Sequence, residues 1–325
     1  MNKQRISMRS IAQELNISAM TLYRVINNAP GVSAATRKRV VEALDKAGVF
    51  QTRSSAPQTV VFDIQDDPYK KNLAFSLLSK ISNQNYNIQI ADHRKSKSGF
   101  LRMIAGAQTV IFFSSPSAET VREVKEENPD IFCINVSGGS EGDIVIGMHN
   151  FLGGRIAAEH LYKNGHRNVA LVTIPIEPTQ LDRHKSFIGE MSVLAPKSKV
   201  HVLFLHNWKT LKRQILHLVQ DKGVTAIFAT CGYIAYQLQK YLLENGIRIP
   251  EQVSLLSYGF PQDMAEEYPF ELDTIGVDLD QIVRMAAYYL RHRPVQDMPI
   301  AYQCYVVPEL QIHGTVCQVD TKNKS

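Results

Sequence analysis

Cysteine is scarce in this sequence, and its spacing excludes the commonest cysteine-based sites. The chain of 325 residues has four cysteines, and no two of them form a C-x-x-C pair. This pattern excludes a zinc ribbon and favours reduced, mostly buried thiols in a cytoplasmic protein. The four residues are Cys133, Cys231, Cys304 and Cys317.

Long apolar runs are also missing. No run approaches the ~18 apolar residues that span a bilayer, and no continuous apolar stretch follows the basic residues of the first 16 positions. We therefore expect no membrane partner, no export signal and a cytoplasmic location. With 44% hydrophobic and 21% charged residues, the composition predicts a globular chain of about two domains.

Signatures of catalysis and of cofactor binding are equally absent. The sequence has no G-x-G-x-x-G that opens a helix, no G-x-x-x-x-G-K-[ST] and no G-x-S-x-G. Asp66 and Asp67 could hold a cation and His201 and His206 could bind a metal, but no two histidines stand at i and i+4. We predict no enzyme, no cofactor and no metal.

Positive charge, by contrast, is concentrated at the N-terminal end. Residues 1–58 hold nine basic and three acidic side chains, a net charge of +6, whereas the remainder holds 27 basic and 28 acidic side chains, a net charge of −1. A small basic module joined to a large neutral one indicates that the small module meets a polyanion.

The basic module reads as three short helices over residues 8–15, 19–27 and 34–47. Apolar residues recur at helical spacing in each, and Ser7, Ser18 and Ser33 stand at the expected N-caps. Two short helices joined by a tight corner, followed by a third, predict a helix-turn-helix.

The second helix is the predicted reader of DNA. Arg24 can donate to guanine, and Ala19 and Met20 can contact a thymine methyl group in the major groove. Short donors near the helix ends are suited to phosphate oxygens, although each could instead be only a helix cap. These residues are Ser7, Ser18, Thr21, Asn27, Ser33 and Thr36.

From residue 59 onward, short apolar runs alternate with amphipathic segments. Continuous apolar runs predict strands covered on both faces, and their alternation with helices predicts parallel sheets. About ten strands suit an α/β core of two doubly wound lobes with a cleft between them.

Ligands in such folds bind at the carboxyl ends of the strands. We therefore expect effector contacts in the loops that follow the apolar runs. The candidates are Asp66, Tyr69, Ser114, Arg183, Trp208, Cys231 and Tyr258.

Both modules resemble the lactose/galactose repressor family. The resemblance rests on SIA (10–12), NIS (16–18), TLYRVIN (21–27) and VSAATRKRV (32–40) in the basic module, and on GGRIAAEHL (153–161) and GHRNVAL (165–171) in the core. Carried over by position, it places Ala19, Met20 and Arg24 on the bases and adds Tyr23 to the DNA-contacting set.

The resemblance implies a homodimeric transcriptional regulator, expected to be a repressor, that binds a palindromic operator in double-stranded DNA. Its core would resemble a periplasmic sugar-binding protein and would bind a small-molecule effector. The implied parts are a helix-turn-helix domain (1–50), a hinge (51–58), an effector-binding and dimerisation domain (59–316) and a tail (317–325).

The core departs from the family at two sugar-gripping positions. Where the family has Asn-Asp this chain has Cys231-Gly232, and Ser257-Tyr258-Gly259-Phe260 replaces G-Y/F-D-D. We therefore expect an anionic or aromatic effector rather than a neutral sugar. An effector-independent architectural DNA binder and an enzyme on the doubly wound core are the alternatives.

The hinge departs as well, and this generates a prediction. The family inserts a Leu from a short helix into the minor groove, but residues 49–58 contain no Leu, and Pro57 would interrupt a helix there. Without the wedge, replacing the operator's central base-pair step should change affinity by under ~1 kcal/mol, against roughly 1–3 kcal/mol for a half-site mismatch. Circular-permutation gel shifts that reveal a strong central kink would contradict this.

Overall fold

The computed structural model describes residues 8–26, 31–46, 57–82, 84–175, 178–259, 271–293 and 302–319. The chain divides into two compact units between Gln58 and Thr59. Each unit is described by itself below. The hinge residues 51–56 and the last residues of the tail, 320–325, lie outside the described part of the chain.

The first unit contains the three predicted helices, α1 (Met8–Glu14), α2 (Ala19–Ile26) and α3 (Ala34–Lys46). Their apolar faces meet in a small core that includes Ile11, Leu22 and Val40, each at most 2% exposed. The periodicity in the sequence therefore predicted the three helices, and among the described side chains Val25 is also buried as it indicated.

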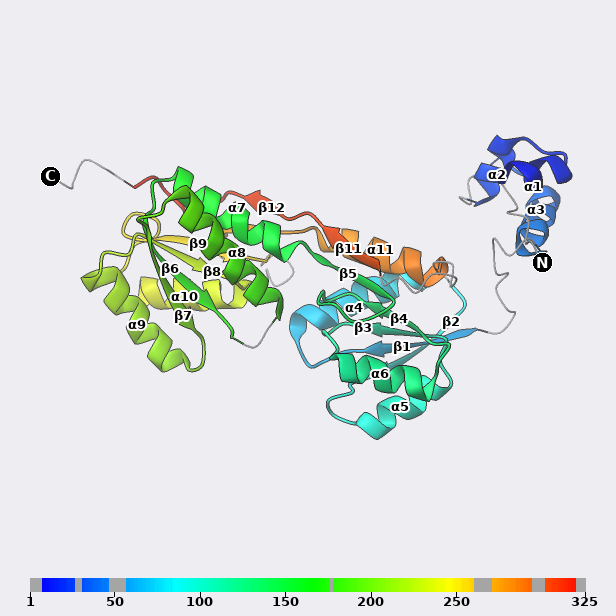
Figure 1. The fold of residues 1–325 in the computed structure, drawn as a ribbon, viewed down its shortest axis with the longest axis horizontal. Helices are drawn as coiled ribbons and strands as arrows, with labels where there is room; N and C mark the ends of the chain where they lie inside the picture. The colour runs from blue at the N-terminus through cyan, green and yellow to red at the C-terminus, as the bar shows by residue number, and fades with distance from the viewer. Residues whose placement is uncertain are drawn as a thin grey trace. The chain divides into compact units, whose positions relative to one another are not determined.

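The second unit consists of two lobes, each built on a six-stranded sheet (Figure 1). In lobe 1 the strand order is β11-β5-β4-β3-β1-β2, with α4 and α11 packed on one face and α5 and α6 on the other. Its elements are β1 (Gln58–Asp63), α4 (Pro68–Ile81), β2 (Tyr86–Ala91), α5 (Lys97–Ala105), β3 (Thr109–Phe112), α6 (Ala118–Glu127), β4 (Phe132–Asn135), β5 (Ile144–Met148), α11 (Leu279–Arg291) and β11 (Tyr302–Val306).

Lobe 2 has the strand order β12-β10-β9-β8-β6-β7, in which only the β10–β12 pair is antiparallel among the pairings described. Helices α7 and α8 cover one face, and α9 and α10 the other. Its elements are α7 (Asn150–Lys163), β6 (Asn168–Thr173), α8 (Pro178–Leu194), β7 (Lys199–Phe204), α9 (Trp208–Asp221), β8 (Ala226–Ala229), α10 (Gly232–Glu244), β9 (Ser254–Tyr258), β10 (Asp273–Gly276) and β12 (Glu309–Gln311).

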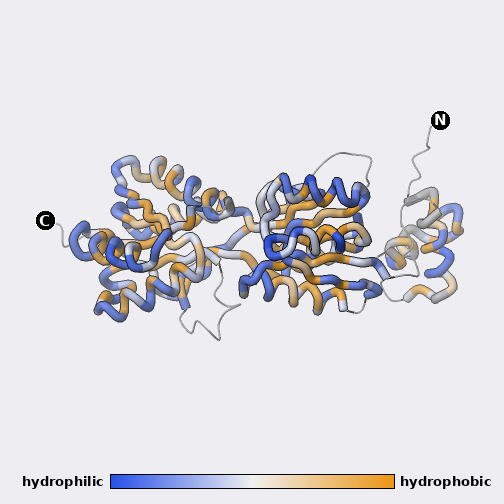
Figure 2. Tube along the Cα trace, turned by 90° about the horizontal axis from the view of Figure 1, so that it is seen from below, coloured by the Kyte–Doolittle hydropathy of each residue, from blue (hydrophilic) through white to orange (hydrophobic). Residues whose placement is uncertain are grey.

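Hydrophobic strands form the centre of each lobe, and the surrounding helices carry hydrophilic residues (Figure 2). Within the described residues the chain passes between the lobes three times: from β5 to α7, from β10 to α11, and from β11 to β12. Two doubly wound lobes are therefore present, as the sequence predicts.

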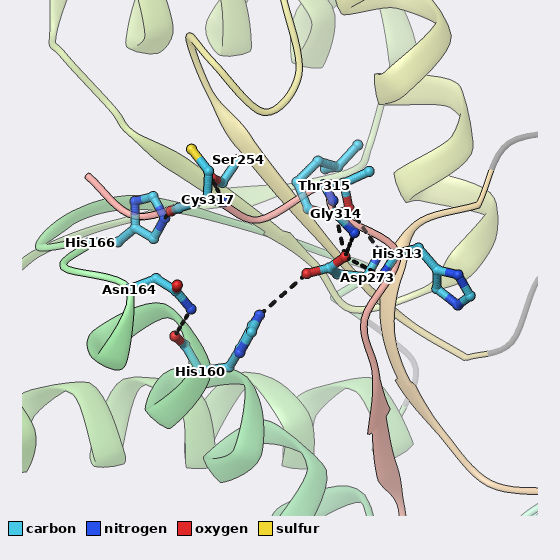
Figure 3. Close-up of polar contacts among 10 residues, drawn as sticks. His160, Asn164, His166, Ser254, Asp273, His313, Gly314, Thr315 and Cys317 are labelled. Carbon is cyan, nitrogen blue, oxygen red and sulfur yellow. Dashed lines mark hydrogen bonds and ion pairs between the residues drawn. The ribbon is translucent and has the colours of Figure 1, made fainter. Parts of the chain in front are cut away.

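The last described segment is tied into lobe 2 by a buried carboxylate (Figure 3). Asp273, 0% exposed, accepts three backbone hydrogen bonds through Oδ1 from His313, Gly314 and Thr315, at 2.7 to 3.0 Å. Its Oδ2 accepts from His160 Nε2 at 3.4 Å. Burial opposes ionisation, but these hydrogen bonds hold the pKa of Asp273 below its ordinary value.

His166 contacts the same segment two residues further along the chain, at Cys317. Its Nε2 lies 3.0 Å from the carbonyl oxygen of Cys317, and its Nδ1 lies 2.9 Å from Thr225 Oγ1. Beyond Cys317, the backbone N–H of Val319 donates to the carbonyl of Asn164. Residues 317–319, which the sequence analysis assigned to the tail, thus belong to lobe 2.

The burial of His166 generates a pH prediction. Burial lowers the pKa of this imidazole to about 4 from 6.5, so the folded chain holds it neutral while the unfolded chain takes up a proton. The contribution of neutral His166 to the free energy of unfolding is complete above the pKa of the unfolded chain. It is lost as the pH falls toward 4, and the loss is about 2 kcal/mol between pH 7 and pH 5. Urea unfolding, followed by Trp208 fluorescence, measures the free energy of unfolding at each pH. Between pH 7 and pH 5 this free energy should fall by about 2 kcal/mol less in His166→Gln than in the wild-type chain. An identical pH dependence of the free energy of unfolding in both proteins would contradict a lowered pKa of His166 in the folded chain.

Helices α7 and α8 lie side by side (Figure 1) and pack closely where α7 has two glycines. A Cβ on Gly154 would overlap the carbonyl oxygen of Arg183 and Oγ of Ser186 on α8. A Cβ on Gly153 would overlap the ring of Tyr258. Glycine at 154 therefore lets α8 come near to α7, and glycine at 153 leaves room for the Tyr258 ring of β9.

Gly154→Ala should therefore destabilise the second unit by roughly 1–3 kcal/mol, because the helices must move apart. Gly189→Ala is the matched control, since Gly189 lies on α8 with nothing within 4 Å of its missing Cβ. That change should be neutral or stabilising by up to about 1 kcal/mol. Urea midpoints measured for both variants test the difference, and equal midpoints would show that the contact is not tight.

Candidate functional site

Helix α2 presents one exposed face beside its buried one. Met20 is 60% exposed and Arg24 is exposed, whereas Leu22 and Val25 are buried in the core of the first unit. Side chains that leave a helix away from its packed face are free to reach base edges. Ala19 and Tyr23 lie on the same helix.

The predicted phosphate-binding hydroxyls lie at the starts of α2 and α3. Ser18 Oγ accepts from the backbone N–H of Thr21 at 3.0 Å, and Ser33 Oγ accepts from that of Thr36 at 3.2 Å. In each pair the two hydroxyls are 2.8 Å apart. These serines therefore cap their helices, as the sequence predicts, and all four residues lie at helix N-termini, where anions are favoured. Ser7 and Asn27 lie outside the described residues.

In lobe 2, Arg183 is the best-positioned charged group among the ligand candidates. The sequence analysis placed it in a loop, which is wrong: it lies in the second turn of α8. Its Nε donates to Asn150 Oδ1 at 2.8 Å and its Nη1 donates to the carbonyl oxygen of Thr230 at 2.6 Å. The guanidinium carbon stands 3.7 Å from the centre of the Tyr258 ring. Residues from α7, β9 and the end of β8 thus hold this cation in one orientation.

Burial raises the pKa of Tyr258, and the charge of Arg183 opposes that shift. The Tyr258 hydroxyl is buried and makes no hydrogen bond of normal geometry within the described part of the chain. Nearby, Gln180 Oε1 accepts from Thr230 Oγ1 at 2.8 Å and from the backbone N–H of Ile174 at 3.2 Å. The polar groups around Arg183 are thus held by the ends of several strands.

Trp208 and Cys231 lie at the starts of neighbouring helices. Trp208 is the first residue of α9, and its ring meets that of Tyr233 edge to face with the centroids 5.9 Å apart. Cys231 is the half-buried N-cap of α10. Both side chains pack against the same hydrophobic cluster of lobe 2, so four of the seven ligand candidates belong to this lobe.

The other three candidates lie in lobe 1 and differ in exposure. Asp66 is exposed and pairs with Lys71, which lowers the pKa of the carboxyl. Tyr69 lies half-buried on α4. Ser114 is fully buried, and its hydroxyl donates to Asp63 at 3.4 Å instead of facing solvent.

Asp63 explains why Ser114 is turned inward. This carboxylate, at the end of β1, is fully buried; it accepts from the backbone N–H of His93 at 2.9 Å and lies 2.8 Å from His93 Nδ1. Such a network positions the strand ends of lobe 1, because an unpaired buried carboxylate is costly.

Asn150 and Thr230, the two groups that hold Arg183, were missed by the sequence analysis. Thr230 directly follows the apolar run of residues 225–229, so its position was an available signal. Asn150 follows β5, a strand that the sequence analysis did not predict.

Among the described residues, no group of three or more His, Cys, Asp or Glu side chains is arranged to hold a metal ion. None of the helices described is both long and apolar enough to cross a bilayer.

Two family models match the chain. Residues 7–48 match the model described as bacterial regulatory proteins, lacI family. Residues 158–316 match the periplasmic binding protein-like domain. The first match covers the helix-turn-helix and the second covers most of lobe 2.

Curated relatives match over most of their length. The HTH-type transcriptional repressor PurR of Vibrio atlanticus is 23% identical over 301 residues, covering 83% of this chain and 86% of the relative. PurR of Vibrio parahaemolyticus is 22% identical, covering 95% and 98%. Both are named as repressors, so neither supports the enzyme alternative.

Solved structures share the fold. A LacI family transcriptional regulator from Enterococcus faecium with bound ribose has a TM-score of 0.68 at 21% identity, covering 81% of this chain and all of that one. The lac repressor dimer bound to operator has a TM-score of 0.65 at 16% identity, covering 97% and 100%. The chain therefore combines a DNA-binding domain of the lacI family of bacterial regulatory proteins with a periplasmic binding protein-like domain.

Proposed function

We propose that this protein is a transcriptional regulator, a repressor, that binds a palindromic operator in double-stranded DNA as a homodimer. The exposed face of α2 carries the proposal, since Met20 and Arg24 project from it within a unit of net charge +6. Its curated relatives are repressors, and the lac repressor was solved as a dimer on its operator. The place of action is the cytoplasm, where bacterial DNA lies.

We also propose that the core binds a small-molecule effector, which is anionic or aromatic, and that this effector modulates DNA binding. Arg183 supplies a fixed cation for such a ligand, and Trp208 with Tyr233 supplies aromatic surface. The lac repressor and the Enterococcus faecium regulator were solved with small ligands in place. The ligand of this chain need not be a sugar, because no carboxylate that would hydrogen-bond a polyol occurs among the described partners of Arg183.

Arg24→Ala tests the reading role of α2. Loss of a base contact should cost roughly 1–3 kcal/mol on the cognate operator and relax the preference at one base pair in each half-site. Lys38→Ala is the matched control, because Lys38 is also exposed but lies on α3. That change should at most weaken binding to all sequences alike. Fluorescence anisotropy with cognate and random duplexes measures both, and an equal loss on the two duplexes for Arg24→Ala would contradict the role.

A further inference from the structure

Helix α10 begins without a side-chain cap. Its N-cap, Cys231, has no side-chain hydrogen bond to the first turn, and Gly232 follows it with no side chain. The other eight helices whose N-caps are described are capped by a side chain, from Ser18, Ser33, Asp67, Ser96, Ser117, His149, Asn207 and Asp278. The first N–H groups of α10 are therefore left without a side-chain acceptor, at the positive end of the helix dipole.

A buried hydroxyl group lies beside this terminus. Ser257 is 0% exposed, and its Oγ makes no hydrogen bond within the described part of the chain. It is the second-last residue of β9, which pairs with β8, and α10 follows β8. Ser257 Oγ lies 3.9 Å from where a Cβ of Gly232 would stand. Buried polar groups are normally hydrogen-bonded, so this position suits a polar group that the described chain does not supply.

A cation stands beside the same terminus. Arg183 donates to the carbonyl oxygen of Thr230, the residue just before the N-cap. Its other described partners are the neutral Asn150 side chain and the Tyr258 ring, and no ion pair of Arg183 occurs among the described residues. A guanidinium group has five N–H donors, so donors remain for a further acceptor.

We infer that the N-terminus of α10, together with Arg183, is an anion subsite that takes a carboxylate or phosphate group of the effector. This inference rests on the proposed function and narrows its effector class. The first-turn N–H groups accept the negative charge along the helix axis, and Arg183 adds charge-assisted hydrogen bonds from α8. The bound group would bridge two helices from opposite faces of the lobe 2 sheet.

The test compares two N-cap variants of the full chain by calorimetry. Cys231→Asp and Cys231→Asn introduce side chains of nearly equal size that cap helices equally well, but only the first carries a charge. Probes are inorganic phosphate, succinate and, as a neutral molecule, ribose. We expect one of the two anions to bind the wild-type chain more tightly than ribose, and to bind Cys231→Asp at least about tenfold more weakly than Cys231→Asn. Phosphate bound without succinate, or the reverse, identifies which group the effector carries.

Equal affinities of the two variants for the bound anion would overturn the inference, as would binding of ribose alone. If Cys231→Asp fails to fold, as judged by its melting curve, Arg183→Gln replaces it and should weaken the same anion by about tenfold. An unchanged affinity in Arg183→Gln would overturn the inference equally. The proposed function fails separately: it fails if the chain shows no sequence-specific DNA binding, whatever the calorimetry reports.

Discussion

The close contact between α7 and α8 determines where ligand chemistry can occur in lobe 2. Gly154 lets α8 come so near to α7 that Arg183 reaches Asn150 on one side and Thr230 on the other. Gly153 leaves room for the Tyr258 ring on which the guanidinium stacks. Two residues without side chains thus help to position the Arg183 cation.

The two units of the chain differ in net charge and in where their charged groups lie. The first unit buries a small apolar core and leaves its basic side chains outside, which suits attraction to the phosphate backbone of DNA. The second unit is nearly neutral overall and buries two carboxyl groups in specific networks, Asp63 with His93 and Asp273 with the segment after β12. Sequence recognition and ligand recognition are thereby assigned to separate parts of one chain.

Local patterns in the sequence predicted the first unit well, because short helices depend on periodicity and on caps such as Ser18 and Ser33. The strands of the two sheets were harder to predict from the sequence. β11 and β12 were not predicted, because only Val306 among their residues is buried and they lack an apolar run, and because their partners β5 and β10 lie far away in the sequence. Ser114 follows a recognised strand, but its burial depends on Asp63, which no local pattern reveals.

At the candidate ligand site, too, local sequence patterns predicted some features, whereas contacts between distant segments were not predicted. The residue type at Arg183 pointed to a ligand-binding role, but the mixed pattern of α8 concealed the helix that carries it, and its partners lie 33 and 47 residues away. Contacts that depend on such distant segments cannot be derived from spacing. They follow only from the packing of helices around a formed sheet.

The central claim is that the chain is a sequence-specific, dimeric reader of DNA, and selection from a random pool of duplexes tests it most directly. Repeated rounds of binding by the full chain, followed by sequencing, should enrich a single inverted repeat with two equivalent half-sites. Enrichment of no common sequence, or of a site without twofold symmetry, would contradict the account.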